Sequence, residues 1–122
     1  MAASLVVPHR ECLMSPRSTL PGIAFAKMTG SGNDFVFFDG RQVPLEHVTS
    51  PEVIKSICNR HNGIGADGIV GLEPARPHAD VRIHYFNSDG TPADLCGNAT
   101  LCSTAMSVLL GLATDSGMTL AT

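Results

Sequence analysis

Cys96 is the residue of this sequence best placed for chemistry, because it lies between a predicted strand and a predicted helix. Residues 81–86 alternate apolar and polar side chains, as a half-buried strand does, and N-S-D-G at 87–90 supplies the turn that ends it. Apolar residues then recur at helical spacing up to Gly111. The N–H groups and positive dipole end of such a helix start favour a thiolate and can hold a carboxylate. Position alone leaves open that Cys96 is a small buried hydrophobic residue.

Two glycine-rich segments lie upstream of this region. Residues 23–28 and 35–39 are predicted strands, and T-G-S-G-N at 29–33 joins them, so the backbone of this loop can come close to a ligand. N-G-I-G-A-D-G at 62–68 leads into the apolar run 69–72, a predicted buried strand. This second segment lacks the Lys-Ser/Thr ending of a phosphate-binding loop, which argues against a nucleotide site.

A helix is predicted between the two glycine-rich segments. Thr49 or Ser50 can cap it, with Pro51 and Glu52 in its first turn. Residues 118–122 begin another predicted strand. The buried stripe of the helix is predicted to contain Val53, Ile54, Ile57 and Cys58.

Length and composition indicate one small domain with a small-molecule partner. The chain has 122 residues, 43% hydrophobic content and a formal net charge of −3, which suit a single domain with its own core. It has no Lys/Arg cluster and no Trp, which argues against a nucleic-acid surface. No apolar run approaches the roughly 18 residues of a membrane span, so no membrane contact is predicted.

The four cysteines are predicted to be thiols in a reducing compartment, which we take to be the cytoplasm. Cys58 and His61 are three positions apart, and Cys96 and Cys102 are six apart. Because no C-x-x-C pair occurs, no metal site is predicted.

Residues 1–22 are predicted to be a loose leader, and residues 23–122 to form the domain. The leader contains three prolines, scattered charges and no sustained periodicity. Its apolar run at residues 5–7 is too short for the core of a signal peptide. An incorrectly assigned start codon is the favoured interpretation, with an organellar transit peptide as the alternative.

Three motifs resemble those of the diaminopimelate epimerase family and follow the family's order. Residues 25–35 resemble its N-terminal K-M-x-G-x-G-N-D-F, and residues 59–68 resemble its R-H-x-G-I-G-A-D-G. F-N-S-D-G at 86–90, followed by C-G-N at 96–98, resembles its active-site segment. The resemblance extends from about residue 23 to residue 113.

The resemblance implies an α/β (α+β) fold in which a curved mixed or antiparallel sheet wraps around the central helix of residues 96–111. Family members have two similar domains facing each other across the substrate, so this chain corresponds to the first domain and lacks the second. The implied enzyme is a cofactor-independent isomerase that converts LL-diaminopimelate to the meso form, in lysine and cell-wall precursor biosynthesis. Two cysteines invert the α-carbon: a thiolate removes the proton, and a thiol delivers one from the opposite face.

The motif matches also imply roles for individual residues. Cys96 would be one of the two catalytic bases, while Gly97 and Asn98 would lie at the substrate carboxylate. Asn33 and Asn87 would position the amino acid through side-chain hydrogen bonds. No metal or other cofactor is implied. Besides the amino-acid substrate, the expected partner is a second copy of the chain or a missing second half.

Two departures from the family pattern C-G-N-G-x-R-C leave alternatives open. Ala99 replaces the second Gly, and Leu101 replaces the Arg. These changes could alter substrate choice or activity, and they favour the alternative of a proline racemase-like or other isomerase acting on a different small acid. A second alternative is an inactive fragment or a small-molecule binding module, because only 26 residues follow Cys96.

Overall fold

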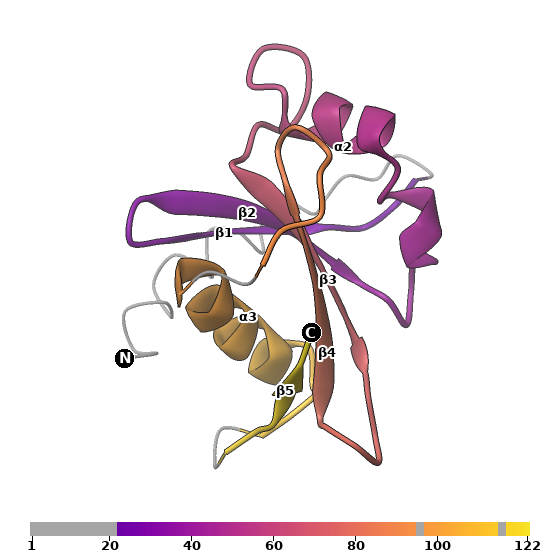
Figure 1. The fold of residues 1–122 in the computed structure, drawn as a ribbon, viewed down its shortest axis with the longest axis vertical. Coiled ribbons are helices and arrows are strands. Elements are labelled where there is room, and N and C mark those ends of the chain that lie inside the picture. Colours follow the sequence, from indigo (N-terminus) through magenta and orange to yellow (C-terminus); the bar gives the residue numbers. More distant parts are fainter. Residues whose placement is uncertain (1–21, 95–96, 115–116) are drawn as a thin grey trace.

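The computed structural model describes residues 22–94, 97–114 and 117–122. Its framework is one five-stranded sheet in the order β1-β2-β3-β4-β5 (Figure 1). The β2–β3 and β4–β5 pairs are parallel, and the β1–β2 and β3–β4 pairs are antiparallel. The mixed sheet confirms the predicted α/β (α+β) class. The strands are β1 (Ala26–Gly30), β2 (Asn33–Asp39), β3 (Gly68–Pro74), β4 (Val81–Asn87) and β5 (Leu120–Ala121).

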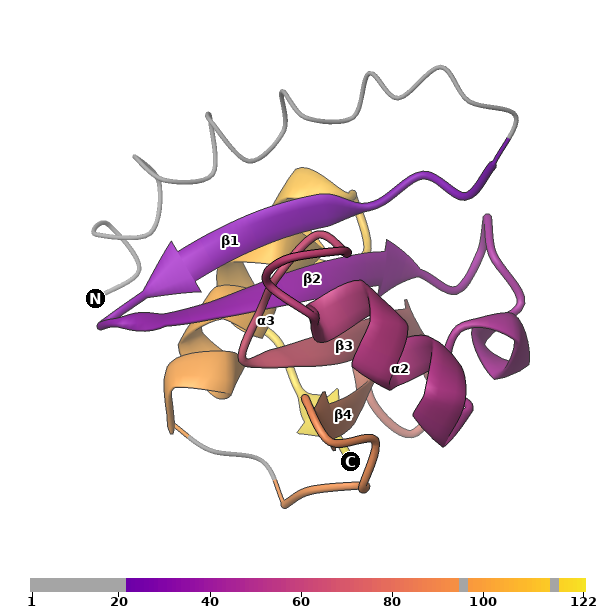
Figure 2. The ribbon, with the colours of Figure 1, turned by 90° about the horizontal axis from the view of Figure 1, so that it is seen from above.

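Helices α2 (Pro51–Cys58) and α3 (Gly97–Leu109) cover opposite faces of this sheet (Figure 2). Successive residues of a strand point to opposite faces, and β2 is buried on both sides. A continuous apolar run is therefore what its position requires. The α3 face buries Met28, Phe35, Phe37, Val70, Leu72, Val81 and Ile83 with Ala99, Cys102 and Met106. The α2 face buries Val36, Phe38 and Ile69 with Val43, Val48, Ile54, Cys58 and Ala66.

The connection between β1 and β2 is shorter than the loop predicted over residues 29–33. Both strands extend into that segment and leave a two-residue turn at Ser31 and Gly32, with φ angles of 53° and 90°. Two positive φ values characterise a type I′ hairpin turn, whose twist matches that of the flanking strands. Strand β1 correspondingly begins at Ala26 rather than at residue 23.

Helix α2 forms as its sequence predicts. Ser50 is the N-cap, and its Oγ accepts a hydrogen bond from the backbone N–H of Val53 at 3.4 Å. Pro51 follows in the first turn, where its missing N–H has no intrahelical partner to lose. Ile54 and Cys58 are buried in the sheet-facing stripe. The connection through α2, preceded by the short 3-10 helix Leu45–His47, carries the chain from β2 to its parallel neighbour β3.

Helix α3 ends beside an ion pair between the exposed Arg41 and the buried Asp39. Gly111 has a φ of +76°, which ends the helix at the predicted position. Arg41 donates to both carboxylate oxygens of Asp39 and to the carbonyl of Leu110 at 2.6 Å. Burial opposes ionisation of Asp39, but the Arg41 hydrogen bonds keep its pKa below the ordinary value. The arginine thus stabilises the negative end of the helix dipole.

Within the described residues, no helix has the length and apolar character that a membrane span requires. The same residues include no group of three or more His, Cys, Asp or Glu side chains arranged to hold a metal ion.

Candidate active site

Strand register brings three motifs to the same end of the sheet. Phe35 of β2 pairs with Gly68 of β3, and Gly68 pairs in turn with Asn87 of β4. The residues that precede the first two, Asp34 and Asp67, are therefore neighbours although 33 positions separate them. Ser88, just after β4, donates its backbone N–H to the carbonyl of Asp67 at 3.1 Å.

The structure places Asn98 beside Asn33. Asn98 Nδ2 donates to Asn33 Oδ1 at 2.6 Å, across 65 positions of sequence. Gly97, the first residue of α3, is exposed, and a Cβ added to it would have no heavy atom within 4 Å. Cys96 lies outside the described residues, but it directly precedes Gly97 in the sequence.

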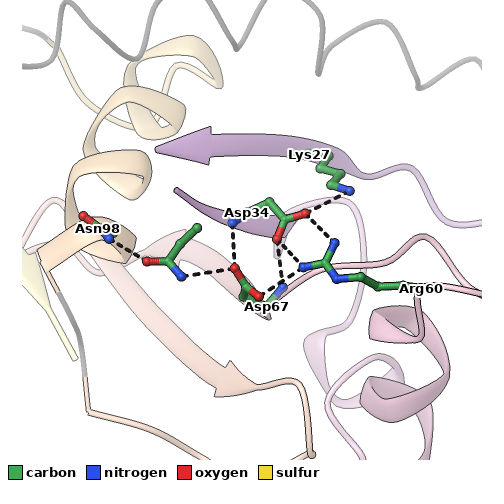
Figure 3. Close-up of polar contacts among 6 residues, drawn as sticks. Lys27, Asp34, Arg60, Asp67 and Asn98 are labelled. Carbon is green, nitrogen blue, oxygen red and sulfur yellow. Dashed lines mark hydrogen bonds and ion pairs between the residues drawn. The ribbon is translucent and has the colours of Figure 1, made fainter. Parts of the chain in front are cut away.

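Asp67 connects this asparagine pair to the strands. Its Oδ2 accepts from Asn33 Nδ2 at 3.1 Å and from the backbone N–H of Asp34 at 3.1 Å. Its own N–H donates back to the carbonyl of Asp34 at 2.9 Å and to Asp34 Oδ1 at 3.1 Å. The two aspartates thus hold the starts of β2 and β3 together reciprocally (Figure 3).

Two cations balance the two carboxylates. Arg60 binds Asp34 through both terminal nitrogens, at 3.0 and 2.8 Å, and reaches Asp67 Oδ1 at 3.1 Å. Lys27 lies 3.1 Å from Asp34 Oδ2 (Figure 3). The hydrogen bonds from Arg60, aided by Lys27, hold the pKa of Asp34 well below its ordinary value despite partial burial. The cluster therefore pairs two acidic side chains with two basic ones.

Asn87 lies on this end of the sheet, with its side chain in a separate turn network. Its Nδ2 donates to Thr91 Oγ1 at 3.1 Å, and its backbone N–H donates to the carbonyl of Thr91 at 2.9 Å. Asp89 closes the turn by accepting from the N–H and hydroxyl of Thr91. The asparagine is half-buried at the end of β4, and its side-chain amide contacts Thr91 rather than Asn33 or Asn98.

The two departures from the family pattern lie in the core. Ala99 is fully buried within the α3 face of the sheet, and Leu101 is partly buried against the same cluster. The Ala99 methyl thus packs against other core side chains of this face. A substitution at either position therefore acts mainly on the packing of α3 against the sheet, and less on the surface of the site.

Both cysteines within the described residues are buried. Cys58 and Cys102 are 5% and 0% exposed, in the cores of the α2 and α3 faces respectively. Burial, reinforced by the negative charge of Asp34, raises the pKa of the Cys58 thiol to about 11. Neither sulfur is accessible to a substrate, and the burial of Cys58 confirms its predicted place in the apolar stripe of α2.

Sequence reasoning missed Lys27, Asp34, Arg60 and Asp67, although each falls within one of the three motifs. A usable signal was present, because Asp34 and Asp67 each immediately precede a buried strand segment. The missing information was the parallel pairing of those strands, which brings the carboxylates together.

Replacement of Asp34 by Asn is expected to lower stability at neutral pH by about 1–2 kcal/mol and to flatten its acid dependence. A carboxylate with a depressed pKa in the folded state stabilises fully above its unfolded value, here 3.8, and this contribution is lost as pH falls. Urea midpoints at neutral pH and below pH 3.8 should therefore lie closer together in the variant. Asp39 retains part of the acid dependence in both proteins. An unchanged separation of the midpoints would contradict this role of Asp34.

Comparison with known proteins supports one family. A family model described as diaminopimelate epimerase matches residues 25–122. A protein named diaminopimelate epimerase from Gemmatimonas aurantiaca is 70% identical over 100 residues, which cover 82% of this chain and 36% of the relative. One of the same name from Archaeoglobus fulgidus is 46% identical over 81 residues, covering 66% and 29%. The matched segment thus spans 29 to 36% of the length of these curated relatives.

Solved structures support the fold alone. A methylitaconate-delta-isomerase superimposes with a TM-score of 0.62 at 16% identity, covering 76% of this chain and 28% of that structure. A phenazine biosynthesis protein of the PhzF family from Bacillus anthracis gives a TM-score of 0.51 at 20% identity, covering 80% and 30%.

Proposed function

The chain belongs to the diaminopimelate epimerase family, and from this we propose that it supplies one catalytic thiol, Cys96, for the inversion of LL-diaminopimelate to the meso form. The main structural support is the contact between Asn33 and Asn98 at the start of α3. This contact joins two motifs that are 65 positions apart in the sequence. One of its two residues, Asn98, lies two positions after Cys96. Gly97 and Asn98 then serve the substrate carboxylate, and Asn33 and Asn87 orient the amino acid.

The chemistry requires the site to stabilise a poor carbon acid. An α-proton beside a carboxylate is very weakly acidic, so charge developing on removal of the proton must be stabilised by fixed hydrogen-bond donors. The first N–H groups of α3 have no intrahelical acceptor, and the helix dipole adds positive potential there. The same potential favours the thiolate form of a cysteine at that position. A bound carboxylate and a thiolate base therefore both benefit from this helix start.

A second base must come from outside the described region. Inversion needs groups on opposite faces of the α-carbon, whereas Cys58 and Cys102 are buried in the two cores. We therefore assign residues 23–122 to the first of two domains, with residues 1–22 as a leader, and propose that the second thiol belongs to the second domain. The greater length of the relatives supports this assignment. A cytoplasmic location suits an enzyme that depends on reduced thiols.

The alternative of a different small-acid substrate loses its main support. It was favoured by Ala99 and Leu101, but Ala99 is buried in the core of the α3 face and Leu101 is partly buried against that core. The network that contacts Asn33 is built from other residues of the family motifs.

Cys96 is expected to react with iodoacetamide faster than Cys58 or Cys102 in the folded chain. Thiolates are the reactive form, and both other sulfurs are buried, with the pKa of Cys58 raised to about 11. Short exposures at neutral pH followed by mass mapping give the three rates. In urea the three rates should converge. Faster modification of Cys58 or Cys102 in the folded state would remove the basis for Cys96 as the base.

The same measurement tests the substrate. LL-diaminopimelate should slow the alkylation of Cys96, because its carboxylate and side chain cover the thiol. Pentane-1,5-diamine, which has the same amines and neither carboxylate, should give no protection. Equal protection by both compounds would contradict recognition of the carboxylate.

A further inference from the structure

Asp67 ends a directional series of hydrogen bonds that passes through two side-chain amides. Asp67 accepts from Asn33 Nδ2, and Asn33 Oδ1 accepts from Asn98 Nδ2. An ionised carboxylate can only accept, whereas either end of an amide can in principle face a neighbour. The carboxylate therefore requires the nitrogen of Asn33 to face it. This leaves the oxygen of Asn33 toward Asn98, which must in turn present its own nitrogen.

Asp67 is itself firmly held. Arg60 donates to its Oδ1 at 3.1 Å, and the backbone N–H of Asp34 donates to its Oδ2 at 3.1 Å. Its peptide group is fixed by Asp34 on one side and by Ser88 on the other. With these contacts its carboxylate has a fixed position relative to β2, β3 and the end of β4.

We propose that Asp67 is a positioning residue that sets the orientation of the Asn33 and Asn98 amides in the substrate site. The inference rests on the proposed function, because it takes these two asparagines as substrate contacts. With both amides reversed, an oxygen would face the Asp67 carboxylate, and Asn98 would present nitrogen where it now presents oxygen. Substrate ammonium and carboxylate groups would then meet the wrong partners, at a cost in affinity.

Asp34 provides a matched control in the same cluster. It also accepts from Arg60, but it contacts neither asparagine side chain through its own carboxylate, which instead receives Lys27, Arg60 and the N–H of Asp67. Asp67→Asn and Asp34→Asn each replace one carboxylate by its amide isostere. Comparison of the two variants should distinguish an effect on the orientation of the Asn33 and Asn98 amides from a general loss of stability.

The experiment records the side-chain amide NMR signals of Asn33 and Asn98 in the 122-residue chain, together with titration by LL-diaminopimelate. In D67N, both pairs of signals should shift, and the affinity should fall roughly tenfold, as expected for loss of a charge-assisted hydrogen bond. D34N should lower the urea midpoint more than D67N does, yet leave the Asn98 signals in place. Asp67→Glu, which retains the charge, should recover part of the affinity.

Three results would overturn the inference about Asp67, and a fourth would count against the proposed function instead. Unchanged Asn33 and Asn98 signals in D67N would overturn the inference, and so would equal effects of D67N and D34N on the Asn98 signals. If D67N does not fold, Asn33→Ala interrupts the same series, and unchanged Asn98 signals in that variant would also overturn it. Absence of binding by the wild-type chain would count against the proposed function, while the amide signals would still report on Asp67.

Discussion

When residues 25–122 replace the matched segment of the Gemmatimonas aurantiaca relative, the graft is expected to invert LL-diaminopimelate, and Cys96→Ala is expected to reduce turnover by about 10²–10⁴-fold. At 70% identity over 100 residues, most contacts with the remainder of the relative should be retained. The graft would then supply the second base that the proposed mechanism requires. Reaction in deuterium oxide, with α-deuteration followed by NMR and the meso product separated chirally, measures proton exchange and inversion together.

Two controls accompany the graft. Cys58→Ala should retain most of the activity, because Cys58 is a core residue of the α2 face. The 122-residue chain alone should show neither exchange nor inversion at an appreciable rate, because a half-site open to water stabilises a carbanion poorly. Robust turnover by that chain, abolished by Cys96→Ala, would contradict the proposal that the second catalytic thiol lies in a second domain. A second copy or another thiol would then supply the second base.

Phe35→Ala is expected to destabilise the domain by about 3–5 kcal/mol, a large part of the roughly 5–15 kcal/mol typical of folded domains. Phe35 is 1% exposed and lies at the centre of the α3 face. Its ring makes edge contacts with Phe37 and Tyr85, at centroid separations of 6.4 and 5.7 Å. Truncation removes these contacts and leaves a cavity in the core of the α3 face.

Urea unfolding at neutral pH checks this prediction, with Phe25→Ala as the matched control. Phe25 is half-buried at the edge of the α2 face and forms neither of these aromatic contacts. Its truncation should cost clearly less than that of Phe35. Equal losses of stability in the two variants would contradict the expected contribution of Phe35 to the core of the α3 face.

The elements with strong local signals could be predicted from the sequence. Helix α2 has a cap, a proline in its first turn and an apolar stripe, and each of these is a local property of the chain. Strand β4 shows the alternation expected of one buried face, and α3 ends at a glycine. The motifs of the family then correctly indicated the mixed α/β architecture around α3.

The polar cluster could not be predicted, because it depends on strand pairing. Asp34 and Asp67 meet only because β2 and β3 run parallel in one particular register, and no local pattern encodes that choice. The contact between Asn33 and Asn98 further depends on where α3 packs on the sheet. The fate of Ala99 also required the structure, since its burial follows from the rotation of α3 about its axis.

The parallel pairing of β2 and β3 also bears on the order of events during folding. The β1–β2 and β3–β4 hairpins close through short loops, and such units form within about 1–10 μs. The contacts of Asp67 with Asp34 and of Asn98 with Asn33 span 33 and 65 positions, so they must wait until the hairpins dock through the α2 crossover. A nascent or partly folded chain can thus contain both hairpins with its asparagines still apart. The contact between Asn33 and Asn98 is therefore expected to form only when the sheet is complete, later than either hairpin.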